Sequence, residues 1–165
     1  MDETIRNALF QAYTGESKAT LRLKVYADKA AEEGFPQLAK LFRVIAFSEE
    51  LHAKRALKLL KEIQSTEENL KTSFESETRV AQVAYDDFIK RATTVGDRAA
   101  SMYFSQSRDA EEIHAKLYKE AIDHTIEERD TTYYVCDYCG YVSDGILPEV
   151  CPICRAKKER FVTFT

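Results

Sequence analysis

The sequence contains no tryptophan, only three prolines, five glycines and three histidines, and no long apolar run. A membrane-spanning helix needs about 20 consecutive apolar residues, so we expect no membrane protein. There is no block of lysine or arginine and the formal net charge is −4, which argues against a nucleic-acid partner. Apolar residues at 44% and charged residues at 32% are typical of a globular protein.

The N-terminal residues, from Met1 to Arg6, lack the basic and apolar regions of a signal peptide. We therefore expect a cytoplasmic protein, in which thiols stay reduced. In that compartment four cysteines are better interpreted as metal ligands than as disulfides.

Glycine, proline and cysteine are distributed unevenly along the chain. Up to residue 130 glycine is scarce and helix formers dominate, whereas the rest holds all four cysteines and two of the three prolines. This shift predicts two domains, residues 1–130 and 131–165. The second is too short to bury a stable core alone, so a bound metal should supply much of its stability.

The first domain is predicted to be an antiparallel four-helix bundle. We expect helices over about residues 4–33, up to about 64, from 65 to about 94, and from there to about 128. The run Gly34-Phe35-Pro36 and the residue Gly96 interrupt the helical pattern. The sequence Ser65-Thr66-Glu67-Glu68 is typical of a helix N-terminus.

The helical region contains an internal repeat. Residues 49–54, Glu-Glu-Leu-His-Ala-Lys, recur at 111–116 as Glu-Glu-Ile-His-Ala-Lys. One glutamate precedes each copy: Glu16 lies 33 residues before Glu49, and Glu77 lies 34 residues before Glu111. The pattern indicates a duplicated helical hairpin, with its glutamates at similar heights relative to the turns.

Six residues of the repeat are predicted to be metal ligands inside the bundle. They follow the apolar stripe of each helix, so every helix turns one carboxylate inward and two helices add a histidine. Four buried carboxylates would repel one another and lose hydration, and two divalent cations remove that cost. Such a set is found in di-iron and di-manganese bundles. The predicted ligands are Glu16, Glu49, His52, Glu77, Glu111 and His114.

Within this set, Glu49 and Glu111 are the predicted bridging carboxylates, and histidine with carboxylates and open positions favours redox-active iron. A single Glu-x-x-His is usually a solvated pair, but two copies, each with an inward glutamate upstream, favour metal. His124 has no such pattern and is expected at the surface. The carboxylates expected to face solvent are Glu50, Glu75 and Glu112.

Four cysteines form two C-x2-C pairs, Cys136 with Cys139 and Cys151 with Cys154, separated by eleven residues. Two such knuckles make a closed tetrahedral site with four sulfur ligands. The spacing predicts a bound metal, and it does not choose between zinc and a single iron.

The two patterns together resemble rubrerythrin over essentially the whole chain, and the C-x2-C-G-Y … C-P-x-C tail resembles a rubredoxin domain. The segments Gly15-Glu16-Ser17, Glu33-Gly34-Phe35-Pro36 and His52-Ala53-Lys54-Arg55 are also similar to that family. The resemblance implies a ferritin-like di-iron bundle followed by a rubredoxin-like iron domain.

The resemblance also implies a peroxidase that reduces hydrogen peroxide and works as a homodimer or higher oligomer. Electrons would come from a reduced nicotinamide cofactor through a separate reductase, or from a rubredoxin. In family dimers, one chain's rubredoxin domain approaches the bundle of another. The implied cofactors are two irons held by the six ligands above and one held by the cysteines, and zinc can occupy either site. Tyr85 matches a tyrosine that hydrogen-bonds a ligand carboxylate.

Three residues depart from the family pattern. Val80 stands where a further glutamate usually lies, which makes the site more like that of bacterioferritins. Leu23 replaces a tyrosine, and Arg155 replaces the glycine expected after the last cysteine. Two alternatives to the peroxidase therefore stay open: a ferroxidase or oxygen-reducing protein, and a helical interaction module with structural zinc.

Overall fold

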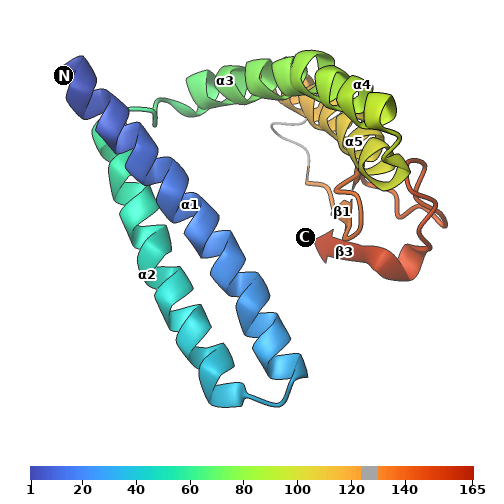
Figure 1. Cartoon of the computed structure of the whole chain (residues 1–165). Coiled ribbons are helices and arrows are strands. Elements are labelled where there is room, and N and C mark those ends of the chain that lie inside the picture. The colour runs from blue at the N-terminus through green and yellow to red at the C-terminus, as the bar shows by residue number, and fades with distance from the viewer. Residues whose placement is uncertain (124–129) are drawn as a thin grey trace. The chain divides into compact units, whose positions relative to one another are not determined.

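A computed structural model describes residues 1–123 and 130–165 (Figure 1). The chain is mainly helical, as the sequence predicts, and it ends in a small three-stranded sheet. It divides into two compact units, residues 1–64 and 65–165, and each is described by itself. The predicted domain division at residue 130 stays a prediction. No helix among the described residues is long and apolar enough to cross a membrane.

The first unit is a hairpin of two long helices, α1 (Glu3–Glu32) and α2 (Pro36–Leu60). Gly34 has a φ of +81°, a left-handed conformation that glycine adopts without strain. The N–H of Phe35 donates to the carbonyl of Ala30 at 2.8 Å, and Pro36 opens α2 with its φ already fixed for a helix. The predicted break between the two helices is confirmed.

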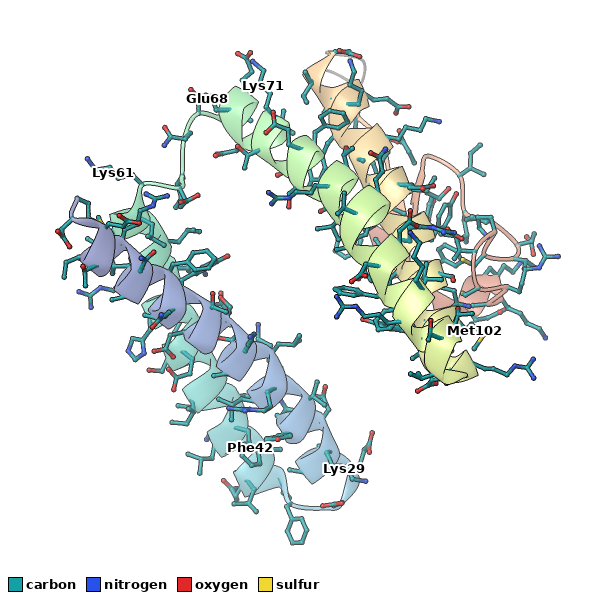
Figure 2. The ribbon with its side chains drawn as sticks, turned by 45° about the horizontal axis from the view of Figure 1, so that its top comes forward. Lys29, Phe42, Lys61, Glu68, Lys71 and Met102 are labelled. Carbon is teal, nitrogen blue, oxygen red and sulfur yellow. The ribbon has the colours of Figure 1, made fainter. Side chains whose placement is uncertain are left out.

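Small side chains form the seam between α1 and α2. Short methyl groups let two helix backbones approach closely, so ligands on facing helices can meet. Nearer the turn, Tyr26 and Phe42 pack edge to face with ring centroids 5.8 Å apart; Figure 2 labels Phe42 on α2 and Lys29 near the end of α1. The seam residues, all 7% exposed or less, are Ala27, Ala30, Ala39, Ala46, Ala53, Ala56 and Leu60.

The helices of the second unit form another antiparallel hairpin. Its first arm consists of α3 (Thr66–Arg79), a π-helix (Val80–Tyr85) and α4 (Asp86–Val95), and its second arm is α5 (Arg98–Ile122). The sequence predicts one continuous α-helix for the first arm, and the π-helix in it is a correction. A π turn holds one residue more than an α turn and is frequently found at functional sites.

Side chains close the ends of these helices. Ser65 and Glu68 form a capping box, in which each side chain pairs with the other's backbone N–H at 3.2 Å. Figure 2 shows Glu68 and Lys71 on the first turns of α3. At the far end Gly96 turns the chain with a φ of +75°, and the carboxylate of Asp97 accepts from the N–H of Ala100 at 2.9 Å. The predicted start and turn of this hairpin are confirmed.

The C-terminal sheet consists of β1 (Tyr133–Cys136), β2 (Val142–Asp144) and β3 (Phe161–Phe164), in the order β2-β1-β3. Both neighbours of β1 are antiparallel to it, and Tyr134 pairs with Ser143 on one side and Thr163 on the other. Tyr141 and Phe161 pack edge to face, with centroids 6.4 Å apart. This small core holds the cysteine-bearing turns.

The turn after the last cysteine contains Arg155 in a left-handed conformation, with a φ of +65°. Its N–H donates to the carbonyl of Cys151 at 3.1 Å, which closes the turn around the second cysteine pair. A side chain with a Cβ is strained in this region of φ, whereas glycine is not. The backbone at Arg155 is therefore strained, and a glycine at this position would not be.

Because of this strain, Arg155→Gly should stabilise the cysteine domain by about 1 kcal/mol. The measurement is the thermal midpoint of the metal-loaded protein, followed through the absorbance of the cysteine–metal bonds. Lys157→Gly, at a φ of −75° in the same loop, is the control and should lower the midpoint. An unchanged midpoint for Arg155→Gly would show that the turn carries no strain.

Candidate metal centres

The first group of candidate ligands lies within the α1–α2 hairpin. Glu49 and His52 lie three residues apart on one face of α2, and Glu16 comes from the facing side of α1. The Nδ1 atom of His52 is 3.1 Å from Oε2 of Glu49 and 4.0 Å from Oε1 of Glu16. One ligand atom from each residue lies within 4.8 Å of the other two, close enough to share one metal ion.

The second group repeats this arrangement within the second unit. Glu111 and His114 lie three residues apart on α5, and Glu77 comes from the last turn of α3. The Nδ1 atom of His114 is 2.8 Å from Oε2 of Glu111, and the three ligand atoms again lie within 4.8 Å of one another. The six predicted ligands thus form two groups of three, one in each unit. That the groups make a single binuclear site stays a prediction.

Crowding of carboxylates in each group raises pKa values. Burial raises the pKa of Glu77 to about 7, helped by a hydrogen bond to Glu111 and by that residue's negative charge. In the other group the hydrogen bond that Glu16 shares with Glu49 is the main cause that raises the pKa of Glu16. A metal ion bound in each group would favour the ionised carboxylates and so oppose the rise in the pKa of Glu16 and of Glu77.

The imidazole of His114 also contacts the cysteine domain. Its Nε2 atom lies 2.9 Å from the carbonyl oxygen of Gly140, the residue after Cys139. A carbonyl oxygen only accepts hydrogen bonds, so in the neutral imidazole Nε2 carries the hydrogen and Nδ1 keeps its lone pair. The hydrogen bond therefore presents Nδ1 of His114 to the metal position beside Glu111.

Tyr85 ends the π-helix and lies half-buried, edge to face with Phe88 at 5.9 Å. Residues eight apart on an α-helix differ by about 80° in direction, but the extra residue of a π turn reduces this to about 20°. The π-helix thus returns Tyr85 to the face of Glu77. Burial raises the pKa of Tyr85, and the negative charge of Glu111 adds to this rise. A hydrogen bond to Ser107 acts in the opposite direction. Its predicted hydrogen bond to a ligand carboxylate stays a prediction.

The four cysteines form one cluster, as predicted from their spacing. The sulfur of Cys136 is 3.6 Å from that of Cys154, and the sulfur of Cys139 is 3.6 Å from that of Cys151. All four sulfurs lie within 4.8 Å of one another and none forms a disulfide. Burial opposes ionisation of Cys136, but backbone N–H groups of Cys139 and Tyr138 outweigh it and lower the pKa of the thiol.

Carboxylates expected in solvent lie outside the groups. Glu75 and Glu112 are exposed as predicted, whereas Glu50 is half-buried because it forms ion pairs with Lys24 and Lys54. His124 lies outside the described residues.

The donor sets fit iron. Two carboxylates and one imidazole in each group are ligands that ferrous and ferric ions accept, and four thiolates hold a single iron tetrahedrally. Residues 16, 49 and 52 and residues 77, 111 and 114 would hold the two irons of a di-iron site. The cysteines would hold a third.

Comparison with known proteins agrees with this assignment. A family model described as rubrerythrin matches residues 7–122, and one described as the rubrerythrin rubredoxin-like domain matches residues 134–162. Rubrerythrin-2 of Clostridium acetobutylicum is 32% identical, with 94% of each chain covered. Nigerythrin of Nitratidesulfovibrio vulgaris is 29% identical over 98% of this chain and 86% of its own. A mixed-valence nigerythrin structure has a TM-score of 0.59 at 28% identity, covering 96% of this chain and 86% of the other.

Carboxylate–histidine groups on helical hairpins, followed by a four-cysteine rubredoxin-like domain, define an iron protein of the ferritin-like class. More specifically, the chain belongs to the rubrerythrin family, whose members are generally oxidoreductases. The fold and family support an iron-dependent protein of oxidative-stress defence.

Two features of these centres have no signal in the sequence. The hydrogen bond between His114 and Gly140 joins residues 26 positions apart. Because Gly140 takes part only through its backbone carbonyl, its residue type gives no signal of the contact. Ser107 on α5 has no distinguishing pattern in the sequence, and only the structure shows that it hydrogen-bonds Tyr85. Both depend on tertiary contacts that periodicity does not reveal.

The raised pKa of Glu77 predicts how the metal-free protein responds to pH. The unfolded chain loses this proton near the ordinary pKa of 4.5 and the folded protein near 7, so stability should fall as pH rises between these values. In Glu77→Gln the fall should be smaller, though still present, because Glu16 also has a raised pKa. The measurement is thermal unfolding by circular dichroism from pH 5 to 8.

Glu75→Gln is the matched control for this experiment, because Glu75 lies on the same helix and is exposed. It should keep the pH dependence of the unsubstituted protein. The same dependence in Glu77→Gln and the control would mean that Glu77 does not hold the proton.

Proposed function

We propose that this protein is a non-haem iron peroxidase that reduces hydrogen peroxide to water in the cytoplasm. The observation that carries the proposal is the pair of Glu/Glu-x-x-His groups, one in each hairpin, together with a four-cysteine cluster in the same chain. Neither a storage protein nor a simple helical scaffold needs both kinds of centre. A cytoplasmic location fits cysteines that must stay reduced to hold a metal.

The two groups would combine into one binuclear centre with Glu49 and Glu111 as bridges. When bound, a ferrous pair supplies the two electrons that cleave the O–O bond, and two protons complete two water molecules. Glu16 and Glu77 would be terminal carboxylates for one ion each, and His52 and His114 would each supply one imidazole nitrogen. The hydroxyl of Tyr85, kept protonated by its raised pKa, can donate a hydrogen bond beside Glu111.

Electrons would reach the centre through the cysteine-bound iron. Their source would be a reduced nicotinamide cofactor and a separate reductase, or a rubredoxin. Nigerythrin, a relative, has solved structures in mixed-valence and fully reduced, all-ferrous states, which supports redox cycling of the irons in this family. The working form would be a homodimer or a higher homo-oligomer.

Glu111→Gln should strongly slow peroxide reduction, because an amide is a poor replacement for a bridging carboxylate. We expect the peroxide-dependent oxidation of the reduced protein to slow on the order of 100-fold, measured by stopped-flow absorbance. Glu112→Gln is the matched control, since this exposed neighbour lies on the same helix and outside the ligand group. Wild-type turnover in Glu111→Gln would exclude the proposed centre.

An oxygen-reducing ferroxidase is the second candidate, and Val80 favours it. Val80 lies three residues after Glu77 and opens the π-helix, at the position where the family usually has a further carboxylate. An alkyl side chain cannot bind metal, so this chain offers a fixed set of four glutamates and two histidines. This ligand set is more symmetric than the usual family set with its further carboxylate. Without that carboxylate, no additional ligand could exchange with a histidine during turnover.

Oxidation by peroxide and by air separates the two candidates. If the protein is a peroxidase, the diferrous protein should be oxidised at least about tenfold faster by stoichiometric peroxide than by air-saturated buffer. The measurement is stopped-flow absorbance under anaerobic loading with iron. Faster oxidation by air would replace the peroxidase with the ferroxidase.

A further inference from the structure

We infer that metal binding by the four cysteines tightens metal binding by the second carboxylate–histidine group, residues 77, 111 and 114. The link is the carbonyl of Gly140, which the cysteine-bound metal fixes against the imidazole of His114. Gly140 is then a positioning residue for a metal ligand of the other centre. The inference concerns how the two centres fill with metal, and it is independent of the reaction that they carry out.

Gly140 belongs to a turn that the cysteines close around their metal. The N–H of Gly140 donates to the carbonyl of Cys136, and the N–H of Cys136 donates to the carbonyl of Tyr141, both at 2.9 Å. Cys136 and Cys139, at the two ends of this turn, are two of the four candidate sulfur ligands. A domain of this size has too small a core to stay folded without its metal. The position of the Gly140 carbonyl therefore depends on whether the cysteines are loaded.

The carbonyl of Gly140 holds the imidazole of His114 from the side opposite the metal position. Nε2 lies 2.9 Å from this carbonyl oxygen, and Nδ1 lies 2.8 Å from Oε2 of Glu111. Without the carbonyl the ring loses this fixed partner, and either nitrogen can carry the hydrogen, so a metal would have to order the ring on binding. Loss of such a partner of a histidine ligand lowers metal affinity about 10- to 100-fold.

Packing around the ring does not replace this hydrogen bond. Leu117 of α5 and Val142 of β2 are among the side chains that line a pocket of about 380 Å³ beside His114. The side chain of His114 is 26% exposed. Because this part of the ring adjoins open space rather than packed atoms, side-chain contacts there cannot fix its orientation. The hydrogen bond to Gly140 therefore carries the coupling between the two centres.

The first carboxylate–histidine group, residues 16, 49 and 52, provides an internal comparison. In its own unit His52 contacts Glu49 and Glu16, and its side chain is 54% exposed. Both of these contacts are to candidate metal ligands, whereas His114 also has a partner that belongs to the cysteine domain. A metal in the cysteines should therefore act directly on the second group alone.

The coupling is reciprocal, because two bound metals that favour the same contact must favour each other by the same factor. A metal in the second group should hold His114 against Gly140 and so stabilise the cysteine domain. Thiolates are the ligands that select zinc and iron, so the cysteines should fill first. The second group would then fill in chains whose cysteine domain is already complete.

Manganese measures this coupling in the unsubstituted protein. Mn²⁺ prefers oxygen ligands to thiolates, so it should bind the carboxylate–histidine groups whether or not the cysteines are occupied. Reduced protein with empty cysteines, and protein loaded with one Zn²⁺ per chain, are titrated with Mn²⁺, and free Mn²⁺ is measured by electron paramagnetic resonance. Zinc should lower the dissociation constant of the second group about tenfold. An unchanged dissociation constant would overturn the inference.

Three variants assign the effect to one group and to the hydrogen bond. His52→Ala weakens the first group and should keep the effect of zinc, whereas His114→Ala should lose it. Val142→Ala is the packing control, because it shortens a side chain of the pocket and leaves the turn at Gly140 in place, and it should also keep the effect. An effect of zinc that persists in His114→Ala, or that disappears in Val142→Ala, contradicts the proposed link.

Isotope labelling of the histidine nitrogens and glycine carbonyls separates the hydrogen bond from the general folding of the domain. In zinc-loaded protein without Mn²⁺, the Nε2–H of His114 should exchange slowly with water and show a coupling to the carbonyl carbon of Gly140. Without zinc this hydrogen should exchange freely, and the ring of His52 should be the same in both samples. A His114 signal that zinc leaves unchanged would exclude the link. These measurements use neither peroxide nor a change of oxidation state, so their result is separate from any failure of the proposed function.

Discussion

The helical units depend on the electrostatic cost of placing carboxylates side by side on half-buried helix faces. Without a cation, Glu77 keeps its proton up to a pH of about 7, because burial and the nearby charge of Glu111 oppose ionisation. The hairpins meet this cost with an imidazole beside each carboxylate pair and with alanine seams that bring the facing helices close. A metal ion bound in each group would favour the ionised form of the carboxylates.

Much of this arrangement could be predicted from the sequence, because helical periodicity and a nearly exact repeat both leave local signals. The breaks at Gly34 and Gly96 and the cap at Ser65 follow from local residue patterns, and the repeated Glu-x-x-His motifs single out the residues of the two groups, which were predicted as one set of six. The π-helix could not be predicted, since one inserted residue changes the direction of a helix face without changing its composition. The link between His114 and Gly140 depends on the placement of a separate domain.

Duplication has produced two groups with the same ligands and different surroundings. In the first, His52 is half-exposed and contacts only carboxylates of its own hairpin among the partners seen there. In the second, His114 is packed under the cysteine domain, and Glu77 has the more strongly raised pKa. The same ligands therefore lie in different surroundings, because a hydrogen bond to Gly140 and a pocket lined by Leu117 and Tyr118 adjoin His114.

The π-helix also bears on how the repeat has diverged. Glu49 follows Glu16 by 33 residues, whereas Glu111 follows Glu77 by 34, and a π turn takes up one additional residue within an otherwise helical arm. A one-residue insertion in one copy of an ancestral hairpin could thus be accommodated by a local π turn. The candidate metal ligands of both copies would then stay on corresponding helix faces. Such a widened turn is a natural place for family members to differ in the residues that follow the first glutamate, because side chains there can be re-aimed without moving the rest of the arm.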